Sequence, residues 1–383
     1  MSLEETTGCL PAPPPAQRQI GVGMLGYAFM GRAHSSAYRR VEELAAAPLR
    51  PRLVAIAGRD ADAVSQAAGR YGWELFTTDW RDVVADANVE LFDNSGPNHL
   101  HAEPTIAAAR SGKHVLCEKP LGRTAEESFE VWQAVAAAGV KHMCGFNYRF
   151  VPAMRLAREM VDAGELGEIR HFRATYLQDW GADAGLAGWR FDPDRAGAGA
   201  LVDLATHAVD LAHYLVGDIA AVAGASRTFV PGRRVDDAVA AVAEFAAGAI
   251  GTIEVSRLSL GHRNALRWEI EGSRASLAFD LERLNELHVL DAGTGRLRGY
   301  KTVLASDAAM PFASWWWPPG HAIGWEHSFV HEICHLLDAI ATDGDVAPHG
   351  ATFEDGYRAA VVCDAIRRSA ELGQRQPISY AAP

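Results

Sequence analysis

The sequence predicts an α/β protein in which an N-terminal doubly wound parallel sheet precedes a C-terminal α/β domain built on a large, mostly antiparallel open sheet. The chain has 383 residues, which exceeds the size at which a single hydrophobic core usually stops growing. Its first part alternates short apolar runs with Ala-rich segments, whereas longer strands separated by Gly, Asn and Asp turns follow residue 150. We therefore expect a disordered leader at 1–18, a first domain at 19–150 and a second domain at 151–383.

Parallel strands joined by helices are predicted for the first domain. Each expected strand is a short run of apolar and β-branched residues, and the segments between strands are rich in helix formers and often end at Gly, a common helix stop. The expected strands are 20–25, 52–58, 74–78, 89–95, 113–119 and 140–146, and the clearest helices are 61–72, 102–112 and 125–139. This alternation is typical of a doubly wound sheet.

The second domain begins with one more helix, at 151–164. Turn residues between the later strands indicate antiparallel pairing. The expected strands are 168–179, 237–257, 266–272 and 286–292, and three strongly patterned helices are expected at about 200–216, 326–342 and 353–372. The first of these helices interrupts the strands, and the other two close the chain.

The composition argues against several classes of partner. The formal net charge is −12 and no block of Lys or Arg occurs, whereas nucleic acids and anionic membranes require clustered positive charge. The leader has no apolar signal-peptide core, and no stretch approaches the roughly 20 apolar residues of a membrane-spanning helix. The five cysteines are widely spaced without a CxxC pair, which fits a reducing cytoplasm better than a disulfide framework or a zinc knuckle. We expect a cytoplasmic protein that acts on a small molecule.

A glycine-rich turn follows the first predicted strand, directly before a helix that begins near Arg32. A Rossmann fold binds the pyrophosphate of a dinucleotide at this place, on free backbone N–H groups at the helix N-terminus. Glycines here also mark simple tight turns, but the position in the first βα connection favours the dinucleotide. The predicted cofactor contacts are Gly26, Tyr27, Ala28, Phe29, Met30 and Gly31. Ala28 replaces the middle glycine of G-x-G-x-x-G, and one methyl group still leaves the backbone accessible.

The end of the second strand bears on the choice of cofactor. An NAD site normally offers a carboxylate there to the ribose 2′-hydroxyl group, whereas an NADP site offers an arginine. Gly58 and Arg59 favour NADP or the use of both cofactors, but Arg59 is equally compatible with a place over the adenine ring. The sequence therefore leaves NAD and NADP both open.

Two further motifs, SGPNHLH at 95–101 and GKHVLCEKPLG at 112–122, stand at the ends of the fourth and fifth strands. Ligands bind at the carboxyl ends of strands in an open α/β sheet. The predicted cofactor contacts here are Ser95, Pro97, Asn98, His101, Glu118 and Lys119. Lys119 is the first candidate for chemistry, because an ammonium group beside a nicotinamide can hold a substrate hydroxyl and stabilise alkoxide charge. A surface lysine before a turn is the alternative, and the isomer of the Lys119–Pro120 bond stays open.

The expected helix at 200–216 carries Asp203, His207 and Asp210. A spacing of four residues places Asp203 and His207 on one helix face, and a nearby carboxylate can orient an imidazole as a general base. A carboxylate near a helix N-terminus beside a buried structural histidine is the alternative. The preceding Gly-Ala-Gly-Ala run favours close approach of another group to this helix.

Together with GMLGYAFMG at 23–31, GFNYRF at 145–150 and GAGALVDLATHAVD at 197–210, these motifs resemble the Gfo/Idh/MocA family of glucose-fructose oxidoreductase, inositol dehydrogenase and rhizopine catabolism proteins. The resemblance runs from about Gln19 to the C-terminus. It implies an NAD(P)-dependent oxidoreductase with a Rossmann domain and a second domain whose large sheet binds substrate and forms a homodimer or homotetramer.

The resemblance also implies roles for single residues. Lys119 would be the catalytic lysine, and Asp203 and His207 would complete a triad in which His207 accepts the hydroxyl proton as the hydride leaves for nicotinamide C4. Trp189 and Arg190 resemble a Trp-Arg pair that lies near the nicotinamide in the family. Without the resemblance they would be a loop aromatic residue and a surface charge.

Aromatic side chains with polar neighbours predict a sugar site, because pyranose rings need apolar contacts to C–H groups and hydrogen bonds to hydroxyl groups. Such segments occur at 176–180 and 315–321, and they resemble a subgroup acting on inositols and anhydrosugars such as levoglucosan. For the tryptophans at 315–317, hydrophobic packing or an oligomer contact is equally compatible. The predicted substrate contacts are Lys119, Tyr148, Tyr176, Gln178, Asp203, His207 and His321. No metal site is expected, although His327, His331 and His335 recur at helical spacing.

The leading hypothesis is hydride transfer between a nicotinamide and a secondary alcohol carbon of a sugar, inositol or anhydrosugar. The alternative is an NAD-dependent glycosidase that uses transient oxidation with no net cofactor turnover. A nucleotide-sensing scaffold is a third possibility, against which the joint presence of Lys119, Asp203 and His207 argues.

Overall fold

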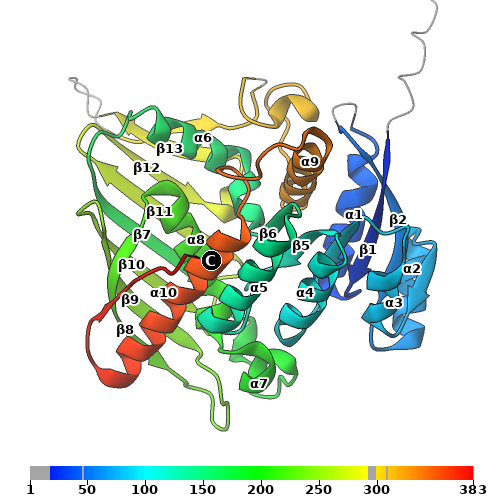
Figure 1. Ribbon diagram of the computed structural model, residues 1–383. Helices are drawn as coiled ribbons and strands as arrows, with labels where there is room; N and C mark the ends of the chain where they lie inside the picture. Colours follow the sequence, from blue (N-terminus) through cyan, green and yellow to red (C-terminus); the bar gives the residue numbers. More distant parts are fainter. Residues whose placement is uncertain (1–17, 45–46, 292–298, 308, 383) are drawn as a thin grey trace, which may run out of the picture.

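The computed structural model describes residues 18–44, 47–291, 299–307 and 309–382 (Figure 1). The leader expected at 1–18 lies outside these ranges except for its last residue. Within them, no helix is both long enough and apolar enough to span a bilayer. The predicted fold class is confirmed: a six-stranded parallel sheet is followed by a nine-stranded, mostly antiparallel one.

The first sheet has the strand order β3-β2-β1-β4-β5-β6, and all its neighbouring strands are parallel. Its strands are β1 (Gln19–Leu25), β2 (Arg50–Ala57), β3 (Leu75–Thr77), β4 (Leu91–Asn94), β5 (His114–Glu118) and β6 (His142–Gly145). The order reverses between β1 and β4, and such a switch point is where a crevice opens at the carboxyl ends of the strands.

Helices connect the strands of this sheet: α1 (Phe29–Val41), α2 (Ala61–Tyr71), α3 (Trp80–Ala85), α4 (Ala102–Arg110) and α5 (Ala125–Ala138). Side chains cap α2, α3 and α5, because Asp60, Asp79 and Thr124 each accept a backbone N–H of the first turn. Helix α1 has no side-chain cap. Its N-terminal N–H groups therefore face the crevice rather than a capping residue.

The second sheet has the order β14-β13-β12-β11-β7-β10-β9-β8-β15, and only the β7–β10 pair among its recorded pairings is parallel. Its strands are β7 (Ile169–Leu177), β8 (Ile219–Arg227), β9 (Ala238–Phe245), β10 (Ile250–Ser256), β11 (Ala265–Gly272), β12 (Ala275–Asp280), β13 (Glu286–Asp291), β14 (Lys301–Leu304) and β15 (Gln376–Pro377). The run expected at 237–257 is a hairpin of β9 and β10, because the turn at 246–249 breaks it.

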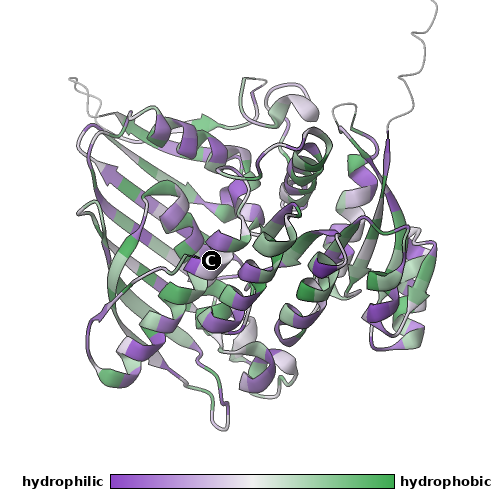
Figure 2. Cartoon of the chain, in the orientation of Figure 1, coloured by the Kyte–Doolittle hydropathy of each residue, from purple (hydrophilic) through white to green (hydrophobic). Residues whose placement is uncertain are grey.

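One face of this sheet is covered and the other is open. Helices α6 (Pro152–Asp162), α8 (Thr206–Leu215) and α10 (Phe353–Leu372) pack on the inner face, and Figure 1 shows α10 lying across β8 to β10. Buried and exposed residues alternate along β9 and β10, and Figure 2 shows the corresponding bands of hydrophobic and hydrophilic residues. Val242 and Ile250 are apolar residues of the open face.

Helix α9 (His327–Thr342) follows the large sheet in sequence but packs on α1 of the first sheet. Its buried residues, such as Phe329 and Ile333, share a core cluster with Ile20 and Val22 of β1. Helix α9 therefore returns to the parallel sheet and adds a layer to it (Figure 1).

Charged groups are buried where α9 meets the parallel sheet. His34 of α1 lies between two carboxylates, with Nδ1 2.8 Å from Asp93 Oδ2 and Nε2 3.1 Å from Glu118 Oε1. Glu332 of α9 is fully buried, and neither of its carboxylate oxygens has a hydrogen-bond partner among the described residues. Burial, together with the negative charge of Glu118 and Asp93, raises the pKa of Glu332 well above its ordinary value.

This burial predicts a pH-dependent stability. Above the ordinary glutamate pKa of 4.5 and below the raised folded value, the folded chain keeps a proton that the unfolded chain releases. The free energy of unfolding should therefore fall as the pH rises, by about 1.4 kcal/mol per pH unit for one proton. Glu332→Gln cannot ionise, so urea unfolding at several pH values should show the variant gaining stability relative to the wild type as the pH increases.

The matched control is Glu371→Gln, which makes the same change at an exposed position of α10. Its stability should follow that of the wild type at every pH. A difference between Glu332→Gln and the wild type that does not change with pH would contradict a neutral buried carboxyl group at this position.

Candidate active site

A cavity of about 850 Å³ opens at the carboxyl ends of β1, β2, β4 and β5. Its lining comes from both sheets: the glycine turn after β1 and the end of β5 form one side, and β7 with the segment before α8 forms the other. The switch point of the parallel sheet therefore faces the large sheet across one shared space.

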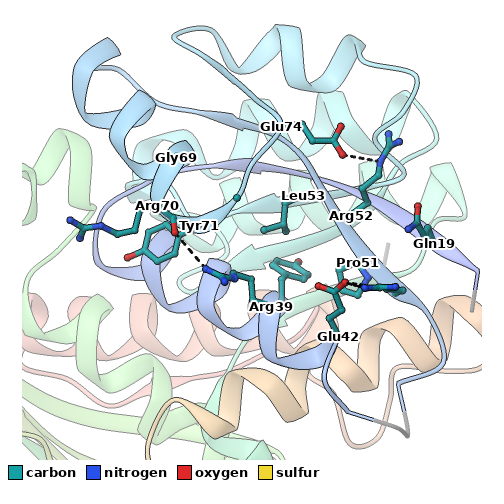
Figure 3. Close-up of a pocket in the computed structure, with 13 residues that line it drawn as sticks. Gln19, Arg39, Glu42, Pro51, Arg52, Leu53, Gly69, Arg70, Tyr71 and Glu74 are labelled. Carbon is teal, nitrogen blue, oxygen red and sulfur yellow. Dashed lines mark hydrogen bonds and ion pairs between the residues drawn. The ribbon is translucent and has the colours of Figure 1, made fainter. Parts of the chain in front are cut away.

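A second hollow, of about 520 Å³, lies at the opposite, amino end of β1 and β2 (Figure 3). Its charged side chains pair with one another, as Arg52 with Glu74 at 3.6 Å and Arg50 with Glu42. Because these ion pairs are exposed and lie away from the carboxyl ends of the strands, we place the functional site in the larger cavity.

The glycine turn has the shape required to receive a pyrophosphate. Gly26 has φ +110°, and a Cβ on Gly31 would lie 2.1 Å from the Gly26 carbonyl oxygen, so α1 approaches the turn more closely than any side chain permits. Gly31 itself is packed behind the cavity, whereas residues 26–30 line it. The uncapped N-terminus of α1 supplies N–H groups and a favourable dipole, and these residues fit a dinucleotide.

The end of β2 offers no carboxylate to the cavity. A Cβ on residue 58 would lie 2.1 Å from the Tyr27 ring, so the ring occupies the space that a side chain would need. The Asp60 carboxylate caps α2 by accepting the Ala63 N–H at 2.9 Å. Arg59 lines the cavity.

The motifs after β4 and β5 meet at the cavity. Ser95, Pro97, Asn98 and Glu118 line it, and the Ser95 hydroxyl donates to the Leu25 carbonyl oxygen at 3.0 Å, which joins the ends of β4 and β1. His101 does not line the cavity. Its ring nitrogens lie 2.6 Å from the Pro120 carbonyl oxygen and 3.0 Å from that of Gly96, so it supports the two turns from behind.

Lys119 and Asp203 form an ion pair between the two sheets. Lys119 Nζ lies 3.2 Å from Asp203 Oδ1 and donates to the Asp203 carbonyl oxygen at 2.8 Å. The Lys119–Pro120 bond is cis. The other carboxylate oxygen, Oδ2, accepts Arg257 Nη2 at 3.0 Å. Burial favours the neutral acid, but Lys119 and Arg257 hold the pKa of Asp203 well below its usual range, so the carboxylate is an anion.

The segment that carries Asp203 is a π-helical turn, η5 (Leu201–Ala205), and α8 begins directly after it. π-helical turns are rare in proteins, and many of those that occur lie at functional sites. Gly199 enters the turn so closely to Asp236 that a Cβ on Gly199 would lie 1.8 Å from the Asp236 carbonyl oxygen. The close approach predicted from the Gly-Ala run is present, and the approaching group is backbone.

His207 lies in the cavity, but among the described residues no hydrogen bond joins it to Asp203, whose two carboxylate oxygens contact Lys119 and Arg257 instead. Aromatic rings hold His207 instead: the centroids of Tyr148, Phe146 and Tyr176 lie 4.6, 5.8 and 5.9 Å from its own. Burial and the positive charge of Lys119 lower the pKa of His207 well below its usual range. A neutral imidazole is therefore available as a proton acceptor.

Polar side chains form a continuous chain along the wall of the cavity. The Tyr148 and Tyr176 hydroxyls are 2.8 Å apart, and the Tyr176 hydroxyl donates to Asn264 Oδ1 at 2.7 Å. Gln178 Nε2 donates to the same oxygen at 2.8 Å, and Trp180 Nε1 donates to Gln178 Oε1 at 2.6 Å. The hydrogen-bond chain joins the segment after β6, β7 and the segments that follow β7 and precede β11, and all five side chains line the cavity.

Trp189 and Arg190 also line the cavity, on the short helix η4 (Trp189–Phe191). The Arg190 guanidinium lies 4.4 Å from the centroid of the Trp189 ring, an arrangement in which the cation covers the ring face. The predicted pair is therefore close enough to act as one surface.

His321 is not brought to the cavity, in contrast to its prediction as a substrate contact. It lies on an exposed turn, with Nδ1 2.9 Å from the Pro318 carbonyl oxygen. Trp315 and Trp316 pack on α9, whereas Trp317 is exposed. Trp316 Nε1 donates to His331 Nε2 at 2.7 Å, and His331 Nδ1 lies 2.9 Å from the Phe150 carbonyl oxygen. The described residues contain no group of three or more His, Cys, Asp and Glu side chains that could hold a metal ion.

The structure thus joins most of the predicted residues at one place and adds others. Asn264 and Arg257 were not predicted, because each acts through partners more than fifty positions away in the sequence. Asn147 and Phe329 also line the cavity without having been predicted. Asp210, which shares the motif of His207, instead accepts Arg149 Nη2 at 2.6 Å in a buried ion pair.

Models of two domains match the chain. Residues 20–146 match the description "Oxidoreductase family, NAD-binding Rossmann fold", and residues 154–278 match "GFO/IDH/MocA C-terminal domain". Among similar proteins, levoglucosan dehydrogenase of Pseudarthrobacter phenanthrenivorans is 40% identical over 380 residues, covering 92% of this chain and 96% of that protein. Inositol 2-dehydrogenase of Rhizobium meliloti is 27% identical over 371 residues, covering 94% and 99%.

A solved structure of levoglucosan dehydrogenase in complex with NADH and levoglucosan superposes with a TM-score of 0.91 at 40% identity, covering 94% of this chain and all of that one. The two domain models, the full-length similarity and the shared cavity lead to one conclusion. The chain belongs to the Gfo/Idh/MocA oxidoreductases with an NAD-binding Rossmann fold.

Proposed function

We propose that the protein is an NAD-dependent dehydrogenase that oxidises a secondary alcohol carbon of an anhydrosugar such as levoglucosan. The observation that carries this proposal is the meeting of Lys119, Asp203 and His207 at one cavity beside the glycine turn. The similarity to levoglucosan dehydrogenase over almost the whole chain supports the substrate class. The complex of that relative with NADH supports NAD, and residues 19–150 and 151–383 are assigned to cofactor and to substrate, respectively.

The three side chains divide the reaction between them. A bound nicotinamide would supply the hydride acceptor at C4. His207, kept neutral by burial and by Lys119, accepts the proton of the substrate hydroxyl while the hydride leaves the carbon that bears this hydroxyl group. The Lys119 ammonium group stabilises the negative charge that develops on the oxygen, and Asp203 holds this group in place.

The other lining residues define the remaining contacts. We assign the cofactor to residues 26–30, Arg59, Ser95, Pro97, Asn98, Glu118, Trp189 and Arg190, and the sugar hydroxyl groups to Tyr148, Tyr176 and Gln178, all of which line the cavity. The polar chain presents several hydrogen-bonding groups at fixed spacing, which suits a rigid polyhydroxylated ring.

The first test combines a substrate panel with one substitution. NAD and NADP are each offered with levoglucosan, inositols and aldoses, and the absorbance of the reduced nicotinamide should rise with NAD and levoglucosan. Lys119→Ala should lower kcat by roughly 10²- to 10⁴-fold, because the developing alkoxide loses its cation. Calorimetric titration with NADH should give a Kd within a few-fold of the wild type.

Two results would remove the assignment. Unchanged turnover in Lys119→Ala would exclude the lysine, and cleavage of a glycoside without accumulation of reduced nicotinamide would favour the glycosidase chemistry instead.

The glycine turn makes a second prediction. Gly31→Ala should lower the affinity for NADH by at least about 10-fold, because a Cβ 2.1 Å from the Gly26 carbonyl oxygen must push α1 away from the turn. Ala28→Gly, three positions earlier, removes a methyl group from the same turn and should leave Kd within a few-fold. Calorimetry measures both, and equal affinities for Gly31→Ala and the wild type would contradict the cofactor site.

We further propose that the protein is a cytoplasmic homo-oligomer whose open sheet face is covered by a second copy. The four described cysteines are buried free thiols, which suits a reducing compartment. The open face places Val242, 42% exposed, and Ile250, 46% exposed, in the middle of a nine-stranded sheet. A second sheet of the same kind would cover these side chains.

Light scattering tests this assembly. Val242→Arg places an unpaired charge on the open face and should shift the mass of the particle toward that of one chain. Leu260→Arg makes the same change at an exposed loop residue outside the strands and should keep the wild-type mass. A wild-type mass of one chain would exclude the proposed assembly.

A further inference from the structure

Arg257 is a buried cation for which the hydride-transfer steps give no role. It follows β10, its side chain is 2% exposed, and it does not line the cavity. Burying a guanidinium group is costly in free energy unless its partners are well placed, so its contacts should indicate what the residue does.

The first contact is with the catalytic carboxylate. Arg257 Nη2 donates to Asp203 Oδ2 at 3.0 Å, while Lys119 Nζ lies 3.2 Å from Oδ1. With one cation on each oxygen, the carboxylate cannot rotate without losing a charged hydrogen bond. The direction in which Lys119 is held therefore depends on Arg257 as well as on Asp203.

The second set of contacts is with the loop between β7 and α7 (Pro193–Ala196). Arg257 Nη1 donates to the Arg190 carbonyl oxygen at 3.3 Å, and its guanidinium lies 5.0 Å from the centroid of the Trp180 ring. The Gly181 N–H donates to the Arg257 carbonyl oxygen at 3.0 Å. This loop carries Trp180, Trp189 and Arg190 of the cavity wall, so one side chain joins the wall to the catalytic carboxylate.

We propose that Arg257 is a positioning residue that fixes the Lys119–Asp203 pair and the Trp180–Arg190 loop relative to each other, and that its charge offsets part of the Asp203 charge that acts on His207. This inference rests on the proposed dehydrogenase function. It assigns Arg257 no contact with substrate or cofactor, since it acts through Asp203 and the loop.

The charged and titratable groups around His207 determine how the loss of the Arg257 charge would change the His207 pKa. Lys119 after β5 and Asp203 on η5 act on it with opposite signs, and Tyr148 and Tyr176 pack against its ring. Burial raises the pKa of both tyrosines, so they stay neutral. Arg257 offsets part of the Asp203 charge, and its removal leaves a more negative site that favours the imidazolium form of His207.

The test compares Arg257→Met with Arg233→Met. Arg233 is also buried, and it anchors the same loop by donating to the Gly181 carbonyl oxygen at 2.9 Å and by covering the Phe191 ring at 4.4 Å. Its ion-pair partner, however, is Asp237 rather than Asp203. The two substitutions therefore both loosen the loop, and only one changes the charge at the catalytic carboxylate.

Two readouts separate these effects. The pKa of His207, followed by NMR of the imidazole and assigned with His207→Gln, should rise by about 0.5–1 unit in Arg257→Met and stay at the wild-type value in Arg233→Met. With a substrate identified from the panel, Arg257→Met should lower kcat by roughly 10- to 100-fold and move the acid limb of kcat/KM to higher pH, whereas Arg233→Met should mainly raise KM.

Arg257→Lys keeps the charge and serves where Arg257→Met fails to fold. It should keep the His207 pKa at the wild-type value while KM rises, because an ammonium cannot hold Asp203, the Arg190 carbonyl oxygen and the Trp180 ring together. An unchanged His207 pKa in Arg257→Met overturns the proposal, as does an unchanged KM in Arg257→Lys. The NMR measurement of the His207 pKa needs no turnover. A wild type that is inactive on the panel would therefore reject the proposed function without deciding the role of Arg257, which the NMR measurement tests independently.

Discussion

The ion pair between Lys119 and Asp203 sets the requirement that the rest of the structure meets. One partner follows β5 of the parallel sheet and the other lies on a π-helical turn beside the large sheet, so a contact of 3.2 Å demands that the two sheets keep a fixed position relative to each other. Buried ion pairs contribute little net stability but are sensitive to geometry. The Arg149–Asp210 pair joins α8 to the segment after β6, and α9 packs on α1, so both contacts tie the second part of the chain to the first.

Two of the buried histidines, His34 and His207, lie on either side of Lys119 in opposite electrostatic surroundings. His34 lies between Asp93 and Glu118, which raise its pKa although burial opposes the charged form. His207 faces Lys119, and burial and that cation lower its pKa. Glu118 connects the two regions, because one carboxylate oxygen faces His34 and the other accepts the Lys119 backbone N–H at 3.1 Å. The fold thus favours the cationic form of the imidazole on one side of Lys119 and the neutral form of the imidazole on the other side.

Local patterns in the sequence predicted the strands of the first sheet, the glycine turn and the residues Lys119, Asp203 and His207, because each rests on spacing within a short segment. The partners of Asp203 were not predictable in this way, since Arg257 lies 54 residues further along the chain and carries no motif. The π-helical turn likewise has no distinct composition. The regular spacing of the histidines in α9 favoured a solvated or core face over a metal site, and it did not predict that His331 accepts from Trp316 and supports a loop.

The hydrogen-bond chain along β7 has a direction, and the direction decides what Tyr148 offers to a ligand. Trp180 N–H orients the Gln178 amide, whose NH₂ group then donates to Asn264 Oδ1, and this fixes that oxygen as an acceptor for the Tyr176 hydroxyl as well. The Tyr176 hydroxyl donates its only proton to Asn264, so Tyr148 is the donor in its 2.8 Å hydrogen bond with Tyr176. The Tyr148 oxygen is left with lone pairs alone toward the cavity, so it can recognise a group that donates a hydrogen bond and discriminates against a ring position that carries only an ether oxygen.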